Sequence, residues 1–127
     1  MWLRAKGEAR GILVTDGISA TGMPDGEYLL GGFAVMVADG RCLLASDLEH
    51  GVETLAGSVL TMDRAVENVR RFTGMGLGAA VGLASWNPAR MLGMDVCEIA
   101  VGRPANFNVY SRDGVLVKTI LAGRVAS

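Results

Sequence analysis

The stretch Gly11-Ile12-Leu13-Val14-Thr15-Asp16-Gly17 says most about how this chain folds. Its first five residues are a short apolar run with β-branched side chains, which is typical of a buried strand. The Asp16-Gly17 pair then ends that strand. A carboxylate at the end of a buried strand can exchange protons with a substrate or a metal-bound water, so Asp16 is the candidate catalytic residue. The alternative is a turn-forming Asp that binds nearby backbone amides.

Turn residues divide the rest of the chain into further elements. The segment Ile18–Gly26 combines glycine, proline and aspartate, which predicts a loop. Two Asp-Gly pairs, Asp39-Gly40 and Asp113-Gly114, predict the tight turns of hairpins over residues 28–44 and 106–121. Ala122-Gly123 predicts a turn into a last short strand. The two hairpins are compatible with one small sheet.

Three helices are predicted between the hairpins. The first follows Thr61 as its N-cap and stops at Gly74. The second spans residues 77–85, where apolar side chains recur at helical spacing. The third has Asn87 as its cap and Pro88 at its first position.

Composition indicates one ordered globular domain. The chain has 127 residues, of which 50% are hydrophobic and 20% charged. Its net charge of -1 gives no basic surface for nucleic acid or an anionic membrane, so neither is expected as a partner. The apolar runs are too short to span a bilayer and the first residues do not resemble a secretory signal. We therefore expect a cytoplasmic protein.

The chain offers few metal ligands or nucleophiles. His50 is the single histidine and lies in the charged segment 47–53, which is typical of a solvated loop. Cys42 and Cys97 form no Cys-x-x-Cys pair, and we expect both to be reduced and packed. The glycines from Gly74 to Gly82 do not have the spacing of a dinucleotide-binding loop. Ser58 is not in a Gly-x-Ser-x-Gly motif, which disfavours a serine hydrolase.

Four stretches of the sequence resemble one enzyme family in order and spacing. They are Arg4-Ala5-Lys6-Gly7, Leu13-Val14-Thr15-Asp16, Leu55-Ala56-Gly57-Ser58-Val59-Leu60-Thr61-Met62 and Ala84-Ser85-Trp86-Asn87-Pro88-Ala89-Arg90. The family is the N-acetylglucosamine-6-phosphate deacetylases of the amidohydrolase superfamily. The second and third stretches are the most specific for it.

The resemblance implies an α/β fold that is the C-terminal part of a metal-dependent (β/α)8 barrel, with strands of a small β-sandwich domain. Residues 1–27 would form the end of barrel helix 7, the last barrel strand and the following loop. Residues 28–54 would form a β-hairpin and loop, residues 55–95 the closing helices, and residues 96–127 the C-terminal strands of the small domain. A complete barrel needs roughly twice this length, so the chain is expected to cut through a domain.

The resemblance also implies roles for site residues. Asp16 matches the catalytic aspartate, which takes a proton from the attacking water and returns it to the departing amine of the sugar. Leu55, Ala56 and Gly57 match a loop that lines the sugar-phosphate site, where small residues let a polar ligand approach the backbone. The alternative for this loop is a structural turn before the helix at Thr61. The implied reaction converts N-acetylglucosamine 6-phosphate to glucosamine 6-phosphate and acetate.

The metal ligands of the family, a glutamate and two histidines on earlier strands, have no counterpart in this sequence. The complete enzyme would hold a divalent zinc or iron ion, whereas no metal is expected for this chain alone, and the isolated chain is expected to be inactive. It is also expected to associate with itself through unpaired strand edges. The alternative function is a non-catalytic interaction or dimerisation module derived from an amidohydrolase.

The sequence departs from the family pattern at three places. Gly17 stands where alanine is common after the aspartate, and the loop over residues 47–53 is longer than usual. The last motif is Gly102-Arg103-Pro104-Ala105-Asn106, where Gly-Lys-x-Ala-Asp is frequent in the family. Only the first departure touches the catalytic position.

Overall fold

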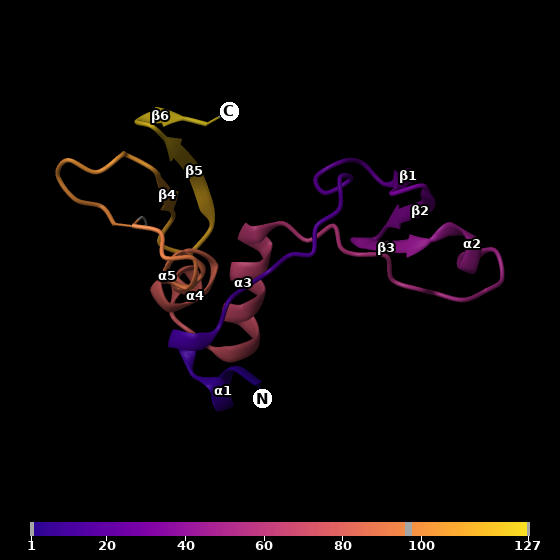
Figure 1. Cartoon of the computed structure of the whole chain (residues 1–127), viewed down its shortest axis with the longest axis horizontal. Coiled ribbons are helices and arrows are strands. Elements are labelled where there is room, and N and C mark those ends of the chain that lie inside the picture. Colours follow the sequence, from indigo (N-terminus) through magenta and orange to yellow (C-terminus); the bar gives the residue numbers. More distant parts are fainter. Residues whose placement is uncertain (1, 96–97, 127) are drawn as a thin grey trace. The chain divides into compact units, whose positions relative to one another are not determined.

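The computed structural model describes residues 2–95 and 98–126 and divides into two compact units. The meander unit comprises Val14–Ala65, and the helical unit comprises Met1–Leu13 with Val66–Ser127. Figure 1 shows the elements of both units, which are described in turn.

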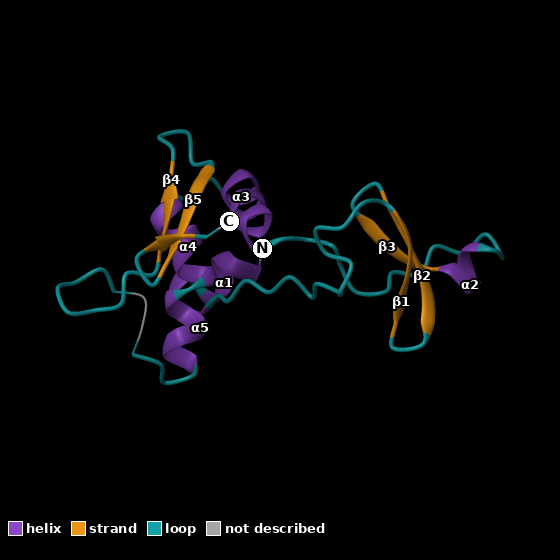
Figure 2. Ribbon diagram, turned by 90° about the horizontal axis from the view of Figure 1, so that it is seen from above, coloured by secondary structure: helices purple, strands orange, loops and turns teal. Residues whose placement is uncertain are grey.

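The meander unit contains a three-stranded antiparallel sheet. Its strands are β1 (Gly26–Leu30), β2 (Phe33–Ala38) and β3 (Arg41–Leu44), paired in the order β1-β2-β3 (Figure 2). Asp39 and Gly40 connect β2 to β3 with φ angles of 53° and 72°, as a type I′ turn requires. The predicted hairpin is thus confirmed at this turn, and a Gly31-Gly32 turn adds β1 to it.

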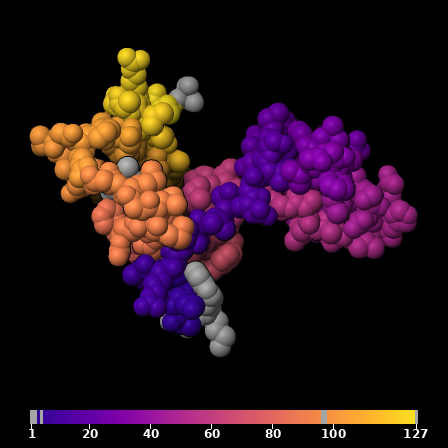
Figure 3. Space-filling model, in the orientation of Figure 1, coloured from indigo at the N-terminus to yellow at the C-terminus, as the bar shows by residue number. Residues whose placement is uncertain are grey.

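One face of this sheet carries the core of the meander unit. Val35 and Val37 alternate along β2 and are buried, with Val35 fully inaccessible. Cys42 pairs with Val37 across the strands and is also buried. Ala20 and Ala56, from the segments before and after the sheet, complete the buried cluster. These segments, violet and magenta in Figure 3, therefore pack together over the sheet.

Cys42 is a free thiol in this core, as predicted, and burial raises its pKa. Cys97 lies outside the described residues. After β3, the short helix α2 (Ala45–Leu48) occupies part of the segment that the sequence predicts as a loop. His50 follows it in an exposed turn, as predicted, and its Nδ1 lies 2.7 Å from the carbonyl oxygen of Ser46.

The prediction of a buried strand over Gly11–Thr15 was wrong. These residues are extended but belong to no strand, and the Val14 side chain is 74% exposed. The Leu13 amide donates instead to the Leu83 carbonyl in the helical unit, at 2.9 Å. A parallel strand exists only where neighbouring strands supply its hydrogen-bond partners. Within the described residues no strand runs beside this segment.

The helical unit begins with α1 (Trp2–Lys6) and the single 3-10 turn η1 (Glu8–Arg10). The helix α3 (Met62–Thr73) enters it from the meander unit and ends at Gly74, whose φ is 74°. This confirms the predicted helix after Thr61. The next helix, α4 (Leu77–Ala84), also follows the prediction.

The third helix begins earlier than predicted. The helix α5 (Trp86–Met91) has Ser85 as its N-cap residue, which leaves α4 and α5 separated by one residue. Asn87 is therefore inside α5 and does not cap it. Its side chain donates to the carbonyl oxygens of Glu8 and Gly11 instead.

A second antiparallel sheet completes the helical unit. It consists of β4 (Phe107–Tyr110), β5 (Leu116–Leu121) and β6 (Arg124–Val125) in the order β4-β5-β6. Ala122 and Gly123 form the turn into β6 with φ angles of 49° and 79°, as predicted. The two hairpins belong to separate sheets, so the expectation of one sheet was wrong. Each hairpin instead pairs with a third strand that is adjacent to it in the sequence.

Across the described ranges 2–95 and 98–126, the helices are all too short or too polar to cross a membrane.

Candidate active site

Asp16 lies at the end of the extended segment, where the chain turns into the meander unit. Its φ angle is 52°, in the left-handed region that aspartate enters more readily than most residues. The side chain is exposed. The carboxylate of Asp16 is therefore open to a ligand even though its backbone has a restricted conformation.

A short parallel bridge fixes the backbone immediately after the Asp16 side chain. Gly17 pairs with Ser58, and this contact joins two segments that are far apart in the sequence. The Ser58 amide donates to the carbonyl oxygen of Asp16, and the Ile18 amide donates to the carbonyl oxygen of Ser58, both at 2.9 Å. The structure thus brings the predicted catalytic residue next to the predicted substrate loop.

Gly57 lies close to the segment that carries Asp16. Its φ is +70°, and a Cβ atom on it would lie 2.7 Å from Cγ2 of Ile18 and 3.3 Å from the carbonyl oxygen of Asp16. The same atom would lie 3.8 Å from Oδ2 of Asp16. Both the backbone conformation and the space therefore require glycine beside the Asp16 carboxylate.

The rest of the loop alternates between the core and solvent. Ala56 is buried, and its amide donates to the carbonyl oxygen of Cys42 at 2.9 Å. Leu55 is 67% exposed and forms an isolated antiparallel bridge with Leu43. Within the part of the chain that the structure describes, the amides of Leu55 and Gly57 have no backbone acceptor. These two N–H groups, of which the one on Gly57 lies beside Asp16, are thus available to an anionic or carbonyl oxygen.

Gly17 also lies in a closely packed position. A Cβ atom there would be 2.9 Å from Oγ1 of Thr21 and 3.3 Å from Oγ1 of Thr15. The Thr21 hydroxyl donates to the carbonyl oxygen of Ser58 at 3.4 Å, and the Gly17 amide donates to Oγ1 of Thr15 at 3.3 Å. The glycine that departs from the family pattern is accordingly surrounded by two hydroxyl groups in the space that an alanine methyl would need.

Comparison with known proteins shows which family this chain resembles in sequence. Residues 5–126 match the model of the amidohydrolase family. The chain belongs to the amidohydrolase family.

Among curated amidohydrolases, the chain is 39% identical over 126 residues to N-acetylglucosamine-6-phosphate deacetylase of Lysinibacillus sphaericus, covering 98% of this chain and 31% of that protein. It is 44% identical over 84 residues to N-acetylgalactosamine-6-phosphate deacetylase of Escherichia coli O157:H7, covering 66% of this chain and 21% of that protein. The chain spans only about a third of the length of the first curated relatives.

Solved amidohydrolase structures have the same fold over almost the whole chain. N-acetylglucosamine-6-phosphate deacetylase of Thermotoga maritima superposes with a TM-score of 0.82 at 37% identity, covering 97% of this chain and 32% of that one. A mutant of the Mycobacterium smegmatis enzyme in complex with N-acetyl-D-glucosamine-6-phosphate gives a TM-score of 0.84 at 32% identity, with coverage of 97% and 32%. The barrel itself is not formed by the described residues, which contain two small antiparallel sheets.

The residues present do not fit the metal that amidohydrolase chemistry implies. Over the described residues, no group of three or more His, Cys, Asp or Glu side chains is placed to hold an ion. His50 lies in the exposed turn after α2, with its Nδ1 on the Ser46 carbonyl. No step of a reaction is therefore assigned to a metal on this chain.

Two residues of this amidohydrolase site were missed at the sequence level. Ser58 attracts attention only as a possible nucleophile, yet its backbone holds Asp16 and its Oγ accepts from the Leu60 amide at 2.8 Å. Thr21 lies in a segment that predicts only a loop, and its hydroxyl reaches Ser58. Both contacts join distant segments, so no local pattern could indicate them. The nearest signal is that the stretches ending at Asp16 and including Ser58 both match the deacetylases.

Proposed function

We propose that this chain is the C-terminal third of an N-acetylglucosamine-6-phosphate deacetylase and that Asp16 is its proton-transferring residue. The observation that supports this most strongly is the contact between Asp16 and Gly57. The candidate base and the candidate sugar-phosphate loop come from distant segments, yet a bridge at Gly17 and Ser58 holds them side by side.

The chemistry of the proposed reaction needs a carboxylate that works in both directions. Hydrolysis of the acetamide requires a water molecule to lose a proton as it attacks the carbonyl carbon. The nitrogen of the sugar must then gain a proton before the C–N bond breaks. Asp16 can perform both transfers, because its side chain is exposed and its backbone is fixed by the bridge. At the end of the reaction the carboxylate is regenerated.

The loop beside Asp16 is suited to hold the substrate. The amides of Leu55 and Gly57 can donate to phosphate or sugar oxygens. Gly57 lets a ligand approach because it has no side chain. The exposed Leu55 side chain would cover an apolar edge of the sugar or of its acetyl group. Substrate binding and proton transfer would thus use two segments that the bridge between Gly17 and Ser58 holds together.

The remaining parts of such a site would come from elsewhere. The described residues provide no metal-binding group, so the isolated chain would not turn over substrate. The metal ligands would be supplied by the part of the relatives that this chain does not match. When bound, a divalent cation would polarise the acetamide carbonyl and lower the pKa of the attacking water.

A second substrate is favoured by one specific comparison. The identity of 44% to an N-acetylgalactosamine-6-phosphate deacetylase is higher than the 39% to the N-acetylglucosamine-6-phosphate deacetylase of Lysinibacillus sphaericus, although it extends over a shorter segment. The two sugars differ only in the configuration at C4, so the same acid-base residue would serve both. We place N-acetylglucosamine 6-phosphate first because that match extends over nearly the whole chain.

A chimeric enzyme tests the proposal. In it, residues 1–127 would replace the matching segment of the Lysinibacillus sphaericus deacetylase, and release of acetate would be measured with both sugar 6-phosphates. Turnover of N-acetylglucosamine 6-phosphate supports the proposal, and faster turnover of the galactosamine substrate would favour the second candidate. A folded, metal-loaded chimera without turnover of either would contradict the deacetylase and favour a non-catalytic interaction module.

A further inference from the structure

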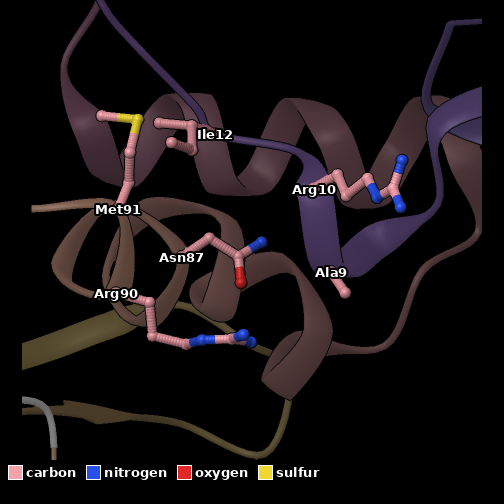
Figure 4. Close-up of a pocket in the computed structure, with 6 residues that line it drawn as sticks. All are labelled: Ala9, Arg10, Ile12, Asn87, Arg90 and Met91. Carbon is pink, nitrogen blue, oxygen red and sulfur yellow. The ribbon is translucent and has the colours of Figure 1, made fainter. Parts of the chain in front are cut away.

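Outside the candidate site, a pocket of about 350 Å³ lies between η1 and α5 (Figure 4). The side chains of Arg10 and Arg90 in it are exposed, and their guanidinium groups do not converge on one point. Nothing in its lining selects a ligand. The lining residues are Ala9, Arg10, Ile12, Asn87, Arg90 and Met91.

The loop over residues 18–23 holds Thr21 in a defined place next to the candidate site. The side chain of Ala20 in this loop is 2% exposed and belongs to the core of the meander unit. The Thr21 amide donates to the carbonyl oxygen of Ile18, and the Met23 amide donates to that of Ala20, both at 3.0 Å. The Thr21 side chain therefore projects from a backbone that is fixed on both sides.

The Thr21 hydroxyl and the Ile18 amide share one acceptor. Both donate to the carbonyl oxygen of Ser58, at 3.4 Å and 2.9 Å respectively. The amide of Ser58 donates in turn to the carbonyl oxygen of Asp16 at 2.9 Å. Thr21 is thus connected to the backbone of Asp16 through a single residue, Ser58.

Asp16 needs such support because its backbone conformation is unfavourable. Its φ of 52° lies in the left-handed region, which costs free energy for a residue with a side chain and persists only where surrounding contacts hold it. Any relaxation of this backbone would move the attached carboxylate. The contacts that hold Ser58 against Asp16 therefore also determine where the carboxylate lies.

Gly17 leaves free the space beside the Thr21 hydroxyl. Its φ is outside the left-handed region, so a left-handed backbone is not what favours glycine at this position. The obstacle to a side chain is Thr21, because a Cβ atom on residue 17 would lie 2.9 Å from its Oγ1. Thr21 could relieve this overlap by rotating its hydroxyl away from the Ser58 carbonyl. Gly17 and Thr21 are thus a matched pair.

We propose that Thr21 is a positioning residue for the carboxylate of Asp16, and that Gly17 is needed for Thr21 to perform this role. The proposal rests on the proposed function, in which Asp16 transfers the proton. The Thr21 hydroxyl acts on Asp16 through Ser58 and not on the reacting atoms. Its loss should let the backbone at Asp16 relax and misplace the carboxylate, and proton transfer is sensitive to such misplacement.

Amide hydrogen exchange of the 127-residue chain tests the contact without any need for activity. In Thr21→Val the Ser58 amide should exchange about tenfold faster, because its bond to Asp16 opens more often. Thr21→Ser keeps the hydroxyl and should stay within about twofold of wild type. Thr119→Val is the matched control, because it removes a hydroxyl that donates to Oδ1 of Asn108 at 2.9 Å in the helical unit. It should leave exchange of the Ser58 amide unchanged.

A double substitution tests the matched pair. Gly17→Ala should accelerate exchange of the Ser58 amide in the wild-type background, because the new methyl group displaces the Thr21 hydroxyl. In a Thr21→Ala background the same substitution should add less than about twofold, since the hydroxyl is absent and the space is free. Equal acceleration by Gly17→Ala in both backgrounds would overturn the proposal, and so would unchanged Ser58 exchange in Thr21→Val.

The chimeric deacetylase tests the effect on the reaction. Thr21→Val should lower kcat by about tenfold while KM changes little, and Thr21→Ser should restore most of the loss. A folded Thr21→Val chimera with unchanged kcat, despite faster Ser58 exchange, would overturn the positioning role and leave Thr21 as a structural residue. An unmodified chimera without turnover would refute the proposed function and not the contact, which exchange of the Ser58 amide decides.

Discussion

At the scale of single residues, the candidate site depends on a glycine. Gly57 has a left-handed backbone, and its missing side chain leaves room for Ile18 and the Asp16 carbonyl. The resemblance to the deacetylases indicates that Gly57 belongs to the site. It does not indicate why a glycine is required there. That reason lies in a contact with a segment some forty residues earlier, and local patterns carry no information about such contacts.

Replacement of Gly57 by alanine measures this contact. The positive φ angle alone costs about 1 kcal/mol for alanine, and the overlap with Ile18 should bring the total to about 2–3 kcal/mol of unfolding free energy. Gly51→Ala is the control, because Gly51 has a φ of +75° but no atom within 4 Å of its Cβ position. Urea unfolding would compare the two variants. Equal losses would mean that the segments at Asp16 and Gly57 are not in close contact.

At the scale of helices and strands, the sequence predicts correctly those turns and helix ends that depend on neighbouring residues. The turns at Asp39-Gly40 and Ala122-Gly123 and the end of α3 at Gly74 each contain a glycine with a positive φ angle, which glycine adopts at little cost. The strand expected over residues 11–15 fails for the opposite reason, because parallel pairing needs partners that a local pattern does not specify. The start of α5 is missed because the Asn87 side chain binds η1 and not the end of its own helix.

The start of α3 gives a pH-dependent prediction. A hydrogen bond from the Thr61 side chain is the main reason why the pKa of Asp63 is below its ordinary value, and backbone amides at the helix start lower it further. A carboxyl group whose pKa is lowered by folding stabilises the folded state above its unfolded pKa. That contribution disappears as the pH falls through the folded pKa.

Thr61→Ala should therefore lower the unfolding free energy at neutral pH by up to about 1 kcal/mol, and less once Asp63 is protonated in acid. Thermal unfolding between neutral and acidic pH would measure the difference. In an Asp63→Asn background the Thr61 substitution should lose most of its pH dependence. A difference between wild type and Thr61→Ala that stays constant with pH would show that the two side chains do not interact.

At the scale of the whole molecule, the described residues divide into two compact units and provide no group of side chains that could hold a metal. We predict that the purified chain retains no stoichiometric zinc or iron after dialysis, because its one histidine and scattered carboxylates cannot provide a full set of ligands. Elemental analysis would measure this. One tightly held ion per chain would contradict the conclusion that this chain lacks a metal-binding group.

The exposed extended segment gives a second prediction at this scale. Several backbone groups of residues 12–15 have no partner among the described residues, Val14 is exposed, and β1 leaves a sheet edge that can pair with another copy. Sedimentation should detect dimers or larger species at micromolar concentrations. The opposite finding would be a stable monomer in which the amides of residues 11–15 are protected from hydrogen exchange.

The Asp16→Asn substitution in the chimeric deacetylase tests the proposed function most directly. Asparagine keeps the size and one acceptor oxygen of aspartate but cannot accept the proton, so kcat should fall by about 10²–10⁴-fold while KM changes little. His50→Gln, at an exposed turn of the same unit, should leave both constants near those of the unmodified chimera. An Asp16→Asn chimera with near-normal kcat at full metal occupancy would show that Asp16 is a turn residue and not the catalytic carboxylate.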